Sequence, residues 1–399
     1  MREFKRIFLI VMDSVGIGHA VDAEEYGDFG KPNTLLNIDQ AIGGLKLPNL
    51  EKLGLGNYDN YLYIRPEKQI KGAFAARFHE QSKAKDTLAG HWEIMGLETT
   101  KPFKTFEENG FPKALIDELI AKTGRGVLGN YAASGTQIIA DLGEEHMKTG
   151  KLIVYTSSDS VLQIAAHEEI IPVPELYRYC EIAREITLKD EWKVGRIIAR
   201  PFIGTKAKNF KRTKRRHDYA LSPFKDTYLD LIKEKSYDIV AIGKINDIYN
   251  GCGITEVQKT LNNDDGMDKT IALAKKSDSF HGLCFVNLVD FDMEFGHRRN
   301  VEGYASCLEK FDKRLGELLK YLKEDDLLIL TADHGNDPTQ DGTNHTRETV
   351  PGLFYSPSFK KGRYLGEFKT FAMIGATVAA NFGIRSSDLL GESLGHLLE

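Results

Sequence analysis

Apolar residues in this chain gather into short, nearly continuous runs, and each run ends in a cluster of polar or glycine residues. Four such runs occupy residues 6–12, 237–243, 283–289 and 327–332. Runs rich in Val, Ile and Leu without regular alternation are typical of strands buried on both faces of a parallel sheet. Apolar residues at helical spacing over 255–276 and 303–323 predict helices between these strands. The pattern therefore predicts an α/β fold, a mostly parallel sheet sandwiched by helices.

The middle of the chain has a different pattern. Residues 101–219 contain their own helical segments at 112–122 and 174–186 and short strand-like segments at 152–156 and 195–199. This stretch separates the first strand of the sheet from the later ones. A chain of 399 residues also exceeds what one hydrophobic core usually fills. We therefore expect a discontinuous core domain, residues 1–100 and 220–399, and an inserted smaller α+β cap domain, residues 101–219.

Composition and charge exclude several classes of protein. The net charge of −5 is small for this length and gives no general attraction to nucleic acid or anionic membrane. The N-terminal apolar run ends at Asp13, and no stretch approaches the roughly 20 apolar residues of a membrane helix. The four cysteines form no C-x-x-C pair. We expect a soluble cytoplasmic protein without membrane association; the sequence carries no signal for an oligomeric state.

Carboxylate and imidazole side chains follow the apolar runs, where open α/β sheets place their ligand sites. The candidates are Asp13, Asp292, His297, Asp333, His334 and His345. Any one of them alone is more often a solvated turn residue than a ligand. Six ligand-type residues, most of them at strand ends and spread over the whole core, are hard to explain as independent turns, and together they indicate a metal centre. Mixed oxygen and nitrogen donors suit divalent Mn or Zn better than Ca or Mg.

Thr87 lies in the segment K-D-T-L-A-G-H-W-E-I-M-G, which predicts the start of a helix with Asp86 or Thr87 in the N-cap region. On local sequence alone, a capping role for Thr87 is favoured over a catalytic one. A phosphate on this hydroxyl would, however, meet backbone N–H groups and the positive end of the helix dipole. Two metal ions could also activate the hydroxyl as a nucleophile.

Four segments occur in the order found in phosphopentomutases. They are M-D-S-V-G-I-G, K-D-T-L-A-G-H-W-E-I-M-G, V-D-F-D-x-x-x-G-H-R-R, and T-A-D-H-G-N-D-P followed by H-T-R-E. Over essentially its full length the chain resembles this family, part of the alkaline phosphatase superfamily. The resemblance implies an alkaline-phosphatase-like fold and Thr87 as the phosphoacceptor. It implies two Mn²⁺ ions, with Zn²⁺ or another divalent ion possible, one held by Asp13, Asp333 and His334 and the other by Asp292, His297 and His345.

The resemblance also implies the reaction. Phosphopentomutases are isomerases that interconvert (deoxy)ribose 1-phosphate and 5-phosphate through a phosphothreonine and a pentose 1,5-bisphosphate. The family is activated by a hexose bisphosphate such as glucose 1,6-bisphosphate. Arg196 and Arg200, four apart on a predicted strand, share a face and could hold a phosphate together, although a solvated face is the alternative. Asp159 could accept hydrogen bonds from sugar hydroxyls, and the resemblance suggests that Asp159, Arg196 and Lys244 contact the substrate.

Three other functions remain open from the sequence. A metal-dependent phosphomonoesterase could use the same core. A cofactor-independent phosphoglycerate mutase would need a serine nucleophile, and Ser14, directly after Asp13, is a poor candidate for it. The basic run at residues 206–217 could suggest a non-catalytic nucleic-acid-binding protein. That run contains one aromatic residue and matches no binding fold, so a solvated hinge is the favoured interpretation and no nucleic-acid partner is expected.

Overall fold

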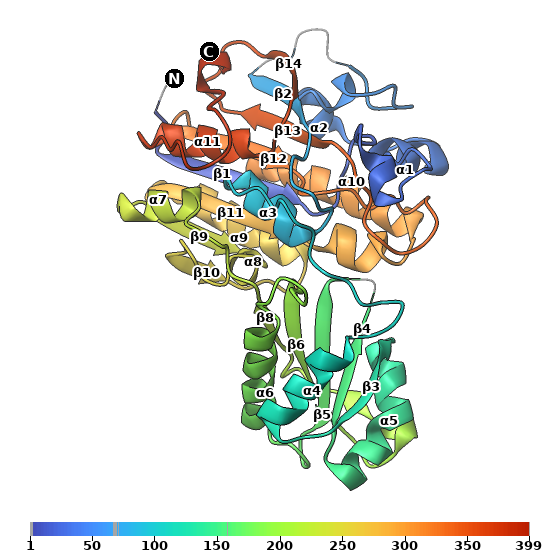
Figure 1. Ribbon diagram of the computed structural model, residues 1–399. Coiled ribbons are helices and arrows are strands. Elements are labelled where there is room, and N and C mark those ends of the chain that lie inside the picture. The colour runs from blue at the N-terminus through green and yellow to red at the C-terminus, as the bar shows by residue number, and fades with distance from the viewer. Residues whose placement is uncertain (1–2, 67–69, 71, 158, 399) are drawn as a thin grey trace. The chain divides into compact units, whose positions relative to one another are not determined.

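The computed structural model describes residues 3–66, 70, 72–157 and 159–398 (Figure 1). The chain divides into two compact units, residues 1–101 with 223–399 and residues 102–222. We call them the core unit and the inserted unit. From the sequence the core is expected to break off at residue 100 and resume at 220; in the structure it breaks off at 101 and resumes at 223. The role of the inserted unit as a cap stays a prediction.

The core unit is built on one twisted sheet (Figure 1). In spatial order its strands are β10 (Glu256–Gln258), β9 (Asp238–Ile242), β11 (Gly282–Leu288), β1 (Arg6–Met12), β12 (Asp326–Thr331), β13 (Val350–Tyr355), β2 (Ala73–Phe78) and β14 (Arg363–Phe368). From β10 to β12 neighbouring strands run parallel, whereas β13 is antiparallel to β12 and β2. Every residue of β1, β11 and β12 is buried, so both faces of the sheet are covered there. The predicted fold class is confirmed.

Two groups of helices cover the core sheet. In one group α11 (Ala372–Asn381) contacts α3 (Thr87–Ile94) and α7 (Tyr228–Glu234), and α3 contacts α8 (Ile245–Ile248) (Figure 1). In the other, α10 (Val301–Leu318) contacts α1 (Thr34–Ile42), α2 (Pro48–Lys52) and α9 (Asn263–Lys275). Short helical turns complete the unit at Ala23–Tyr26, Leu55–Asn57 and Gly395–Leu397, with a π-helical turn, η4, at Phe291–Gly296.

The helix predicted over residues 255–276 begins later than its apolar spacing suggests. Glu256–Gln258 instead forms the edge strand β10, paired in parallel with β9. The helix starts only where a cap is available: the Asn262 side chain accepts a hydrogen bond from the N–H of Asp265 at 3.0 Å. Pairing with a sheet edge thus outweighs helical propensity over the first residues of this segment.

The inserted unit has a second sheet, in the order β3 (Val127–Ala132), β4 (Leu152–Thr156), β5 (Val161–His167), β6 (Arg196–Ile203) and β7 (Lys211–Arg212), with β8 (His217–Ala220) also paired to β6. Side chains alternate between its two faces. Leu152 and Val154 pack in a cluster with α4 (Lys113–Thr123) and α6 (Val173–Ile186), whereas Ile153 and Tyr155 pack with α5 (Gly135–Thr149). This unit therefore has a hydrophobic core of its own.

A buried histidine makes the inserted unit sensitive to acid. On α5, His146 uses Nδ1 to donate to the Lys151 carbonyl at 2.5 Å, and its Nε2 accepts from the His167 N–H at 2.8 Å. These contacts require the neutral ring, and burial lowers the pKa of His146. A pKa lowered by folding means that the unfolded chain takes up the proton first. Stability is therefore full above the unfolded pKa of about 6.5 and falls as the pH drops below it.

We expect the protection factors of the amides in residues 146–167, which compare observed with intrinsic exchange rates at each pH, to fall between pH 7.5 and pH 5.5. The free energy of unfolding should fall by about 1.4 kcal/mol for each pH unit in which only the unfolded chain is protonated. Hydrogen exchange of the whole protein, resolved by peptide, measures this. His146→Gln cannot be protonated in this range and should show less pH dependence. An equal dependence in both proteins would contradict the role of His146.

Two further observations concern the helices and the cysteines. Within the part of the chain that the structure describes, no helix is long and apolar enough to cross a membrane. The cysteines carry free thiols, two of them buried and two half-buried.

Candidate metal centre

The carboxyl ends of three neighbouring parallel strands supply most of the candidate ligands. Asp13 directly follows β1, Asp292 lies in η4 after β11, and Asp333 and His334 follow β12. Because β1 lies between β11 and β12 in register, these side chains meet at one edge of the core sheet. The structure thus brings together residues that are far apart in sequence: Asp13 and His334, 321 positions apart, are members of one candidate ligand group.

The first group consists of Asp13, Asp333 and His334, which are all buried and whose ligand atoms lie within 4.8 Å of one another. His334 Nε2 lies 3.6 Å from Asp13 Oδ1 and 3.4 Å from Asp333 Oδ2. Asp333 is oriented by the Ser14 N–H, which donates to Oδ1 at 3.1 Å. Ser14 adopts a φ of 71°, which is unusual for a residue other than glycine and turns the chain sharply after β1.

The second group surrounds Asp292. Its carboxylate lies 3.1 Å from His297 Nε2 and 3.4 Å from His345 Nε2, and the two Nε2 atoms are 3.1 Å apart. His334 also joins Asp292 and His345 in a group whose ligand atoms lie within 4.8 Å of one another. The six predicted ligands are therefore one continuous cluster with His334 at its centre. How they divide between two ions stays a prediction.

All three histidines are oriented in the same way. In each ring Nδ1 faces a backbone carbonyl. Nδ1 of His334 lies 3.0 Å from the Gly335 carbonyl, and Nδ1 of His297 lies 2.7 Å from the Thr343 carbonyl. Nδ1 of His345 lies 2.9 Å from the Lys85 carbonyl. A Nδ1–H that donates to a carbonyl leaves Nε2 as the lone-pair nitrogen. In each ring Nε2 then faces the carboxylates, which is the arrangement of histidines that bind metal.

The electrostatics of the cluster also fit a divalent cation. Burial, together with the nearby charges of Asp333 and Asp292, raises the pKa of Asp13 to about 7. Burial disfavours a charged imidazole, yet Asp333 and Asp13 raise the pKa of His334 to about 9. Asp13 Oδ1 is buried and finds no hydrogen-bond partner among the described residues. Concentrated negative charge with an unsatisfied carboxylate oxygen is costly unless a cation binds there, so the residues present suit a metal ion.

Thr87 lies beside this cluster as the first residue of α3, and its Oγ1 is 3.2 Å from His334 Nε2. Helix α3 approaches the cluster closely because of Gly90: a Cβ there would lie 2.0 Å from the Asp333 carbonyl oxygen. A glycine inside a helix costs about 1 kcal/mol relative to alanine, so its presence here reflects this close approach.

Asp86 is the N-cap of α3 and accepts from the N–H groups of Leu88 and Ala89. Those two N–H groups are thus bonded to Asp86, and a contact between a phosphate on Thr87 and other backbone N–H groups stays a prediction.

Sequence reasoning missed two residues that support the cluster from behind. On β11, Asn287 donates from Nδ2 to Asp13 Oδ2 at 2.8 Å. Nδ1 of His91, on α3, lies 2.9 Å from the Thr87 carbonyl and 3.0 Å from Asp333 Oδ2. An asparagine inside the apolar run 283–289, and a histidine one helical turn after Thr87, were the available signals.

The predicted substrate-binding residues occupy both units. In the inserted unit, Arg196 Nη2 lies 3.9 Å from Asp159 Oδ2, and Arg200 donates from Nε to Gln163 Oε1 at 3.1 Å. Burial and the neighbouring Arg216 lower the pKa of Arg200 to about 10, which leaves it charged at neutral pH. In the core unit, Lys244 follows β9 and its Nζ lies 3.7 Å from Met293 Sδ, beside Asp292 in sequence. The structure thus brings Asp159 and Arg196 close to each other.

Part of the basic run at residues 206–217 is neutralised locally. Arg215 Nη1 lies 3.0 Å from Glu168 Oε2, and Arg216 forms two hydrogen bonds of 2.6 Å with Asp218. The absence of a nucleic-acid partner stays a prediction.

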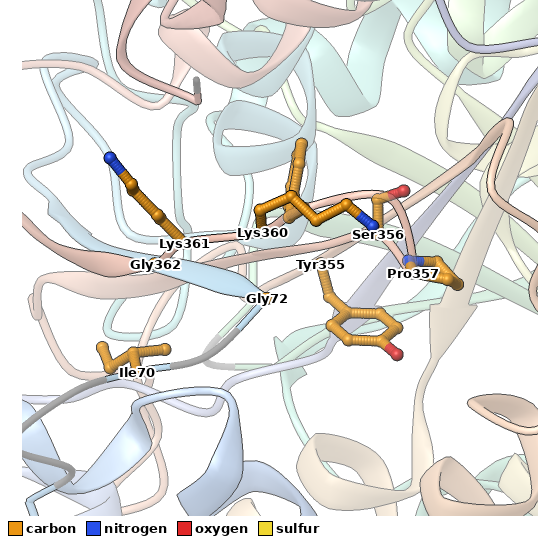
Figure 2. Close-up of a pocket in the computed structure, with 9 residues that line it drawn as sticks. Ile70, Gly72, Tyr355, Ser356, Pro357, Lys360, Lys361 and Gly362 are labelled. Atoms are coloured by element: carbon orange, nitrogen blue, oxygen red, sulfur yellow. The ribbon is translucent and has the colours of Figure 1, made fainter.

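A surface pocket of about 620 Å³ lies at the opposite end of the core sheet. It is lined by residues just before β2 and by the end of β13 and the segment that follows it, among them Gly72, Tyr355 and Lys360 (Figure 2). The metal-ligand candidates instead adjoin the end of β12 and the start of β13. This pocket is therefore separate from the candidate metal centre.

Comparison with known proteins agrees with the site. The chain matches the Metalloenzyme superfamily over residues 5–386, so it belongs to that superfamily. Within it, phosphopentomutases from two type A strains of Clostridium perfringens are 54% identical to this chain over 395 residues, 99% of this chain and 99% of each relative. The chain therefore belongs to the phosphopentomutase family, and the resemblance seen in the motifs is confirmed. A solved phosphoglycerate mutase of Leishmania mexicana is 11% identical and covers 98% of both chains with a TM-score of 0.47, too weak a similarity to carry an argument.

Proposed function

We propose that this chain is a phosphopentomutase, an isomerase that interconverts (deoxy)ribose 1-phosphate and (deoxy)ribose 5-phosphate. Full-length identity of 54% to phosphopentomutases supports the activity. The observation that carries the mechanism is the Thr87 hydroxyl, 3.2 Å from the central histidine of the candidate metal cluster. A cytoplasmic location accompanies this proposal.

The proposed cofactors are two divalent ions, Mn²⁺ by family resemblance, with glucose 1,6-bisphosphate or a similar bisphosphate as activator. Asp13, Asp333 and His334 would hold one ion, and Asp292, His297 and His345 the other. When bound, the ions would lower the pKa of the Thr87 hydroxyl and neutralise charge on the transferred phosphoryl group. Carboxylate and imidazole donors with Nε2 directed inward support this assignment.

In the proposed cycle Thr87 carries the phosphoryl group. Phospho-Thr87 gives it to the free hydroxyl of a pentose monophosphate: the Thr87 O–P bond breaks as the sugar O–P bond forms, which yields the 1,5-bisphosphate. The freed Thr87 hydroxyl then attacks the other phosphate of this intermediate, which releases the isomer and restores phospho-Thr87. An activating bisphosphate phosphorylates Thr87 at the start. The inserted unit would act as a cap that limits hydrolysis of phospho-Thr87.

We propose that Asp159, Arg196, Arg200 and Lys244 recognise the substrate, and Arg196 offers a clear test. Arg196→Ala should raise KM for ribose 1-phosphate about 10- to 100-fold, since a hydrogen bond to a charged group contributes roughly 1.5–3 kcal/mol. Metal content should not change. Arg215→Ala is a matched control, because Arg215 is an exposed, carboxylate-paired arginine of the same unit. Equal KM values in both variants would leave Arg196 without a role in binding.

The proposed activity is tested by incubating the purified protein with ribose 1-phosphate, Mn²⁺ and a trace of glucose 1,6-bisphosphate. Ribose 5-phosphate and free phosphate are then quantified in the same samples. A phosphopentomutase yields ribose 5-phosphate with little free phosphate. Free phosphate without the isomer would instead indicate a phosphomonoesterase on the same core.

A further inference from the structure

The segment that delivers Thr87 to the metal cluster has almost no regular structure. Residues 79–86, here called the nucleophile loop, connect the end of β2 to the start of α3. Along it, buried Glu80, Ser82 and Ala84 alternate with exposed Gln81 and Lys83. The loop is therefore extended, with one edge turned into the protein, and what binds that edge decides where Thr87 lies.

Two buried side chains bind this loop: Glu93 accepts from the N–H groups of Gln81 and Ser82 at 2.9 and 2.6 Å, and Arg347 binds the loop's carbonyls. Arg347 Nη1 donates to the Ser82 carbonyl at 2.8 Å and to the Ala84 carbonyl at 2.5 Å, and Nη2 donates to the Glu80 carbonyl at 2.8 Å. The guanidinium group also pairs with the Glu80 carboxylate at 2.5 Å and with Asp22 through Nε at 3.1 Å and Nη2 at 2.9 Å. Three alternate carbonyls of the loop thus depend on one arginine.

Arg347 is occupied entirely by these contacts. Its side chain is 1% exposed, and Nε, Nη1 and Nη2 all donate to acceptors of the protein. A substrate phosphate could bind it only by displacing them. Its planar, fixed fork of donors suits several carbonyls at once, which the ammonium group of lysine cannot reproduce. The geometry therefore separates Arg347 from substrate-binding arginines.

The same arginine connects the loop to the metal ligands. It lies two residues after His345, whose Nδ1 faces the Lys85 carbonyl of the loop at 2.9 Å. The Arg347 N–H donates to Asp28 at 2.7 Å, and the Lys85 ammonium binds the same carboxylate at 2.8 Å. Residues 345–347 and the nucleophile loop are therefore tied together at several points just before Thr87.

We propose that Arg347 is a positioning residue for the reaction: by holding the carbonyls of Glu80, Ser82 and Ala84 it sets the place of the Thr87 hydroxyl relative to the metal cluster. This inference rests on the proposed role of Thr87. A displacement of about 1 Å at a reacting group can reduce a rate about 10²-fold. The effect belongs to kcat rather than KM, because Arg347 does not contact the substrate.

The test compares Arg347→Lys with Arg6→Lys. Arg6 is a matched control: it is equally buried, pairs with Asp326 at 2.7 Å and donates to the Leu273 and Lys276 carbonyls. It lies at the opposite end of β1, seven residues or about 23 Å from Asp13. Per folded enzyme, Arg347→Lys should lower kcat and the rate of Thr87 phosphorylation about 10²-fold with KM and metal content little changed. Arg6→Lys should lower only the melting temperature.

Equal kcat values for the two variants, corrected for the folded fraction, would overturn the proposal. So would a kcat loss that follows an equal loss of metal, since Arg347 would then act on His345. If Arg347→Lys fails to fold, Asp22→Asn replaces it: Asp22 is 31% exposed, orients the guanidinium group, and its loss should reduce kcat several-fold without changing KM. An unchanged kcat in Asp22→Asn would then overturn the proposal.

Failure of the proposed function gives a different result. A wild-type protein that does not isomerise pentose phosphates would refute the activity. Amide exchange at residues 79–86 would still decide the role of Arg347, with faster exchange expected in Arg347→Lys, or in Asp22→Asn, than in Arg6→Lys. Equal exchange rates at residues 79–86 in the compared variants would contradict the claim that Arg347 holds the nucleophile loop in place.

Discussion

Replacing Thr87 with alanine is expected to abolish isomerisation while leaving metal binding intact. The Thr87 hydroxyl is the proposed acceptor of the phosphoryl group, and it lies 3.2 Å from His334 Nε2. Removal of a covalent nucleophile typically reduces kcat by roughly 10⁴- to 10⁶-fold. The cap of α3 does not depend on this side chain, because Asp86 accepts from the Leu88 and Ala89 N–H groups. Thermal stability should therefore change little.

The matched control is Thr87→Ser, which keeps the hydroxyl and removes a methyl group. This variant should retain measurable isomerase activity and should still be phosphorylated by glucose 1,6-bisphosphate. Kinetics at saturating Mn²⁺, metal analysis and melting temperature complete the comparison. Isomerase activity in Thr87→Ala close to that of the wild type would remove Thr87 from the mechanism.

Asp333→Asn is expected to destabilise the metal-bound protein more than the metal-free protein. Asp333 is fully buried, and its charge raises the pKa of both neighbouring Asp13 and His334. Neutralising it relieves repulsion with Asp13 but also removes attraction to His334, so the two changes oppose each other in the metal-free protein. Mutating a residue that only hydrogen-bonds to a metal ligand typically lowers metal affinity 10- to 100-fold. Loss of a ligand itself should therefore weaken metal binding at one site by at least about 10²-fold.

The difference is measured as the rise in melting temperature on adding Mn²⁺ and as metal content after dialysis. An ion present at 100 times its Kd stabilises the folded protein by about 2.7 kcal/mol, and most of this should disappear for the affected site. Asp312→Asn is a suitable control: this carboxylate is equally buried but caps α2 by accepting from the Leu50 N–H at 2.8 Å. It should lower stability with and without metal alike. Two bound ions in Asp333→Asn would contradict the ligand role.

Those parts of the fold that rest on continuous apolar runs could be predicted from the sequence. β1, β9, β11 and β12 are buried, parallel strands, and their lack of alternation reflects cover on both faces of the sheet. Asp13, Asp333 and His334 were predictable for the same reason, because charged residues that directly follow such a run lie at the edge of the sheet, whereas His297 and His345 lie further along the chain.

The other side of the sheet was not predictable in this way. β2, β13 and β14 include alanine, proline, glycine or charged residues and form no continuous run of Val, Ile and Leu. Their pairing joins residues far apart in sequence, such as Phe78 with Val350. The supporting contacts of the site are equally long-range: Asn287 reaches Asp13, and Arg347 reaches the loop before Thr87. No local periodicity encodes such contacts. From the sequence alone, an arginine near a metal ligand could equally well bind a substrate phosphate. Only the folded arrangement shows that Arg347 is buried and fully bonded within the protein.

The most direct test of the account follows one labelled phosphoryl group. The enzyme is phosphorylated with glucose 1,6-bisphosphate that is labelled in its phosphates, and the excess reagent is removed. One portion is then mapped by peptide mass spectrometry, and the other is mixed with ribose 5-phosphate. The account predicts label on Thr87 and its transfer, within one turnover, to pentose 1,5-bisphosphate and pentose monophosphate. Label on another residue, or its release from Thr87 as inorganic phosphate without appearing in a pentose, would contradict it.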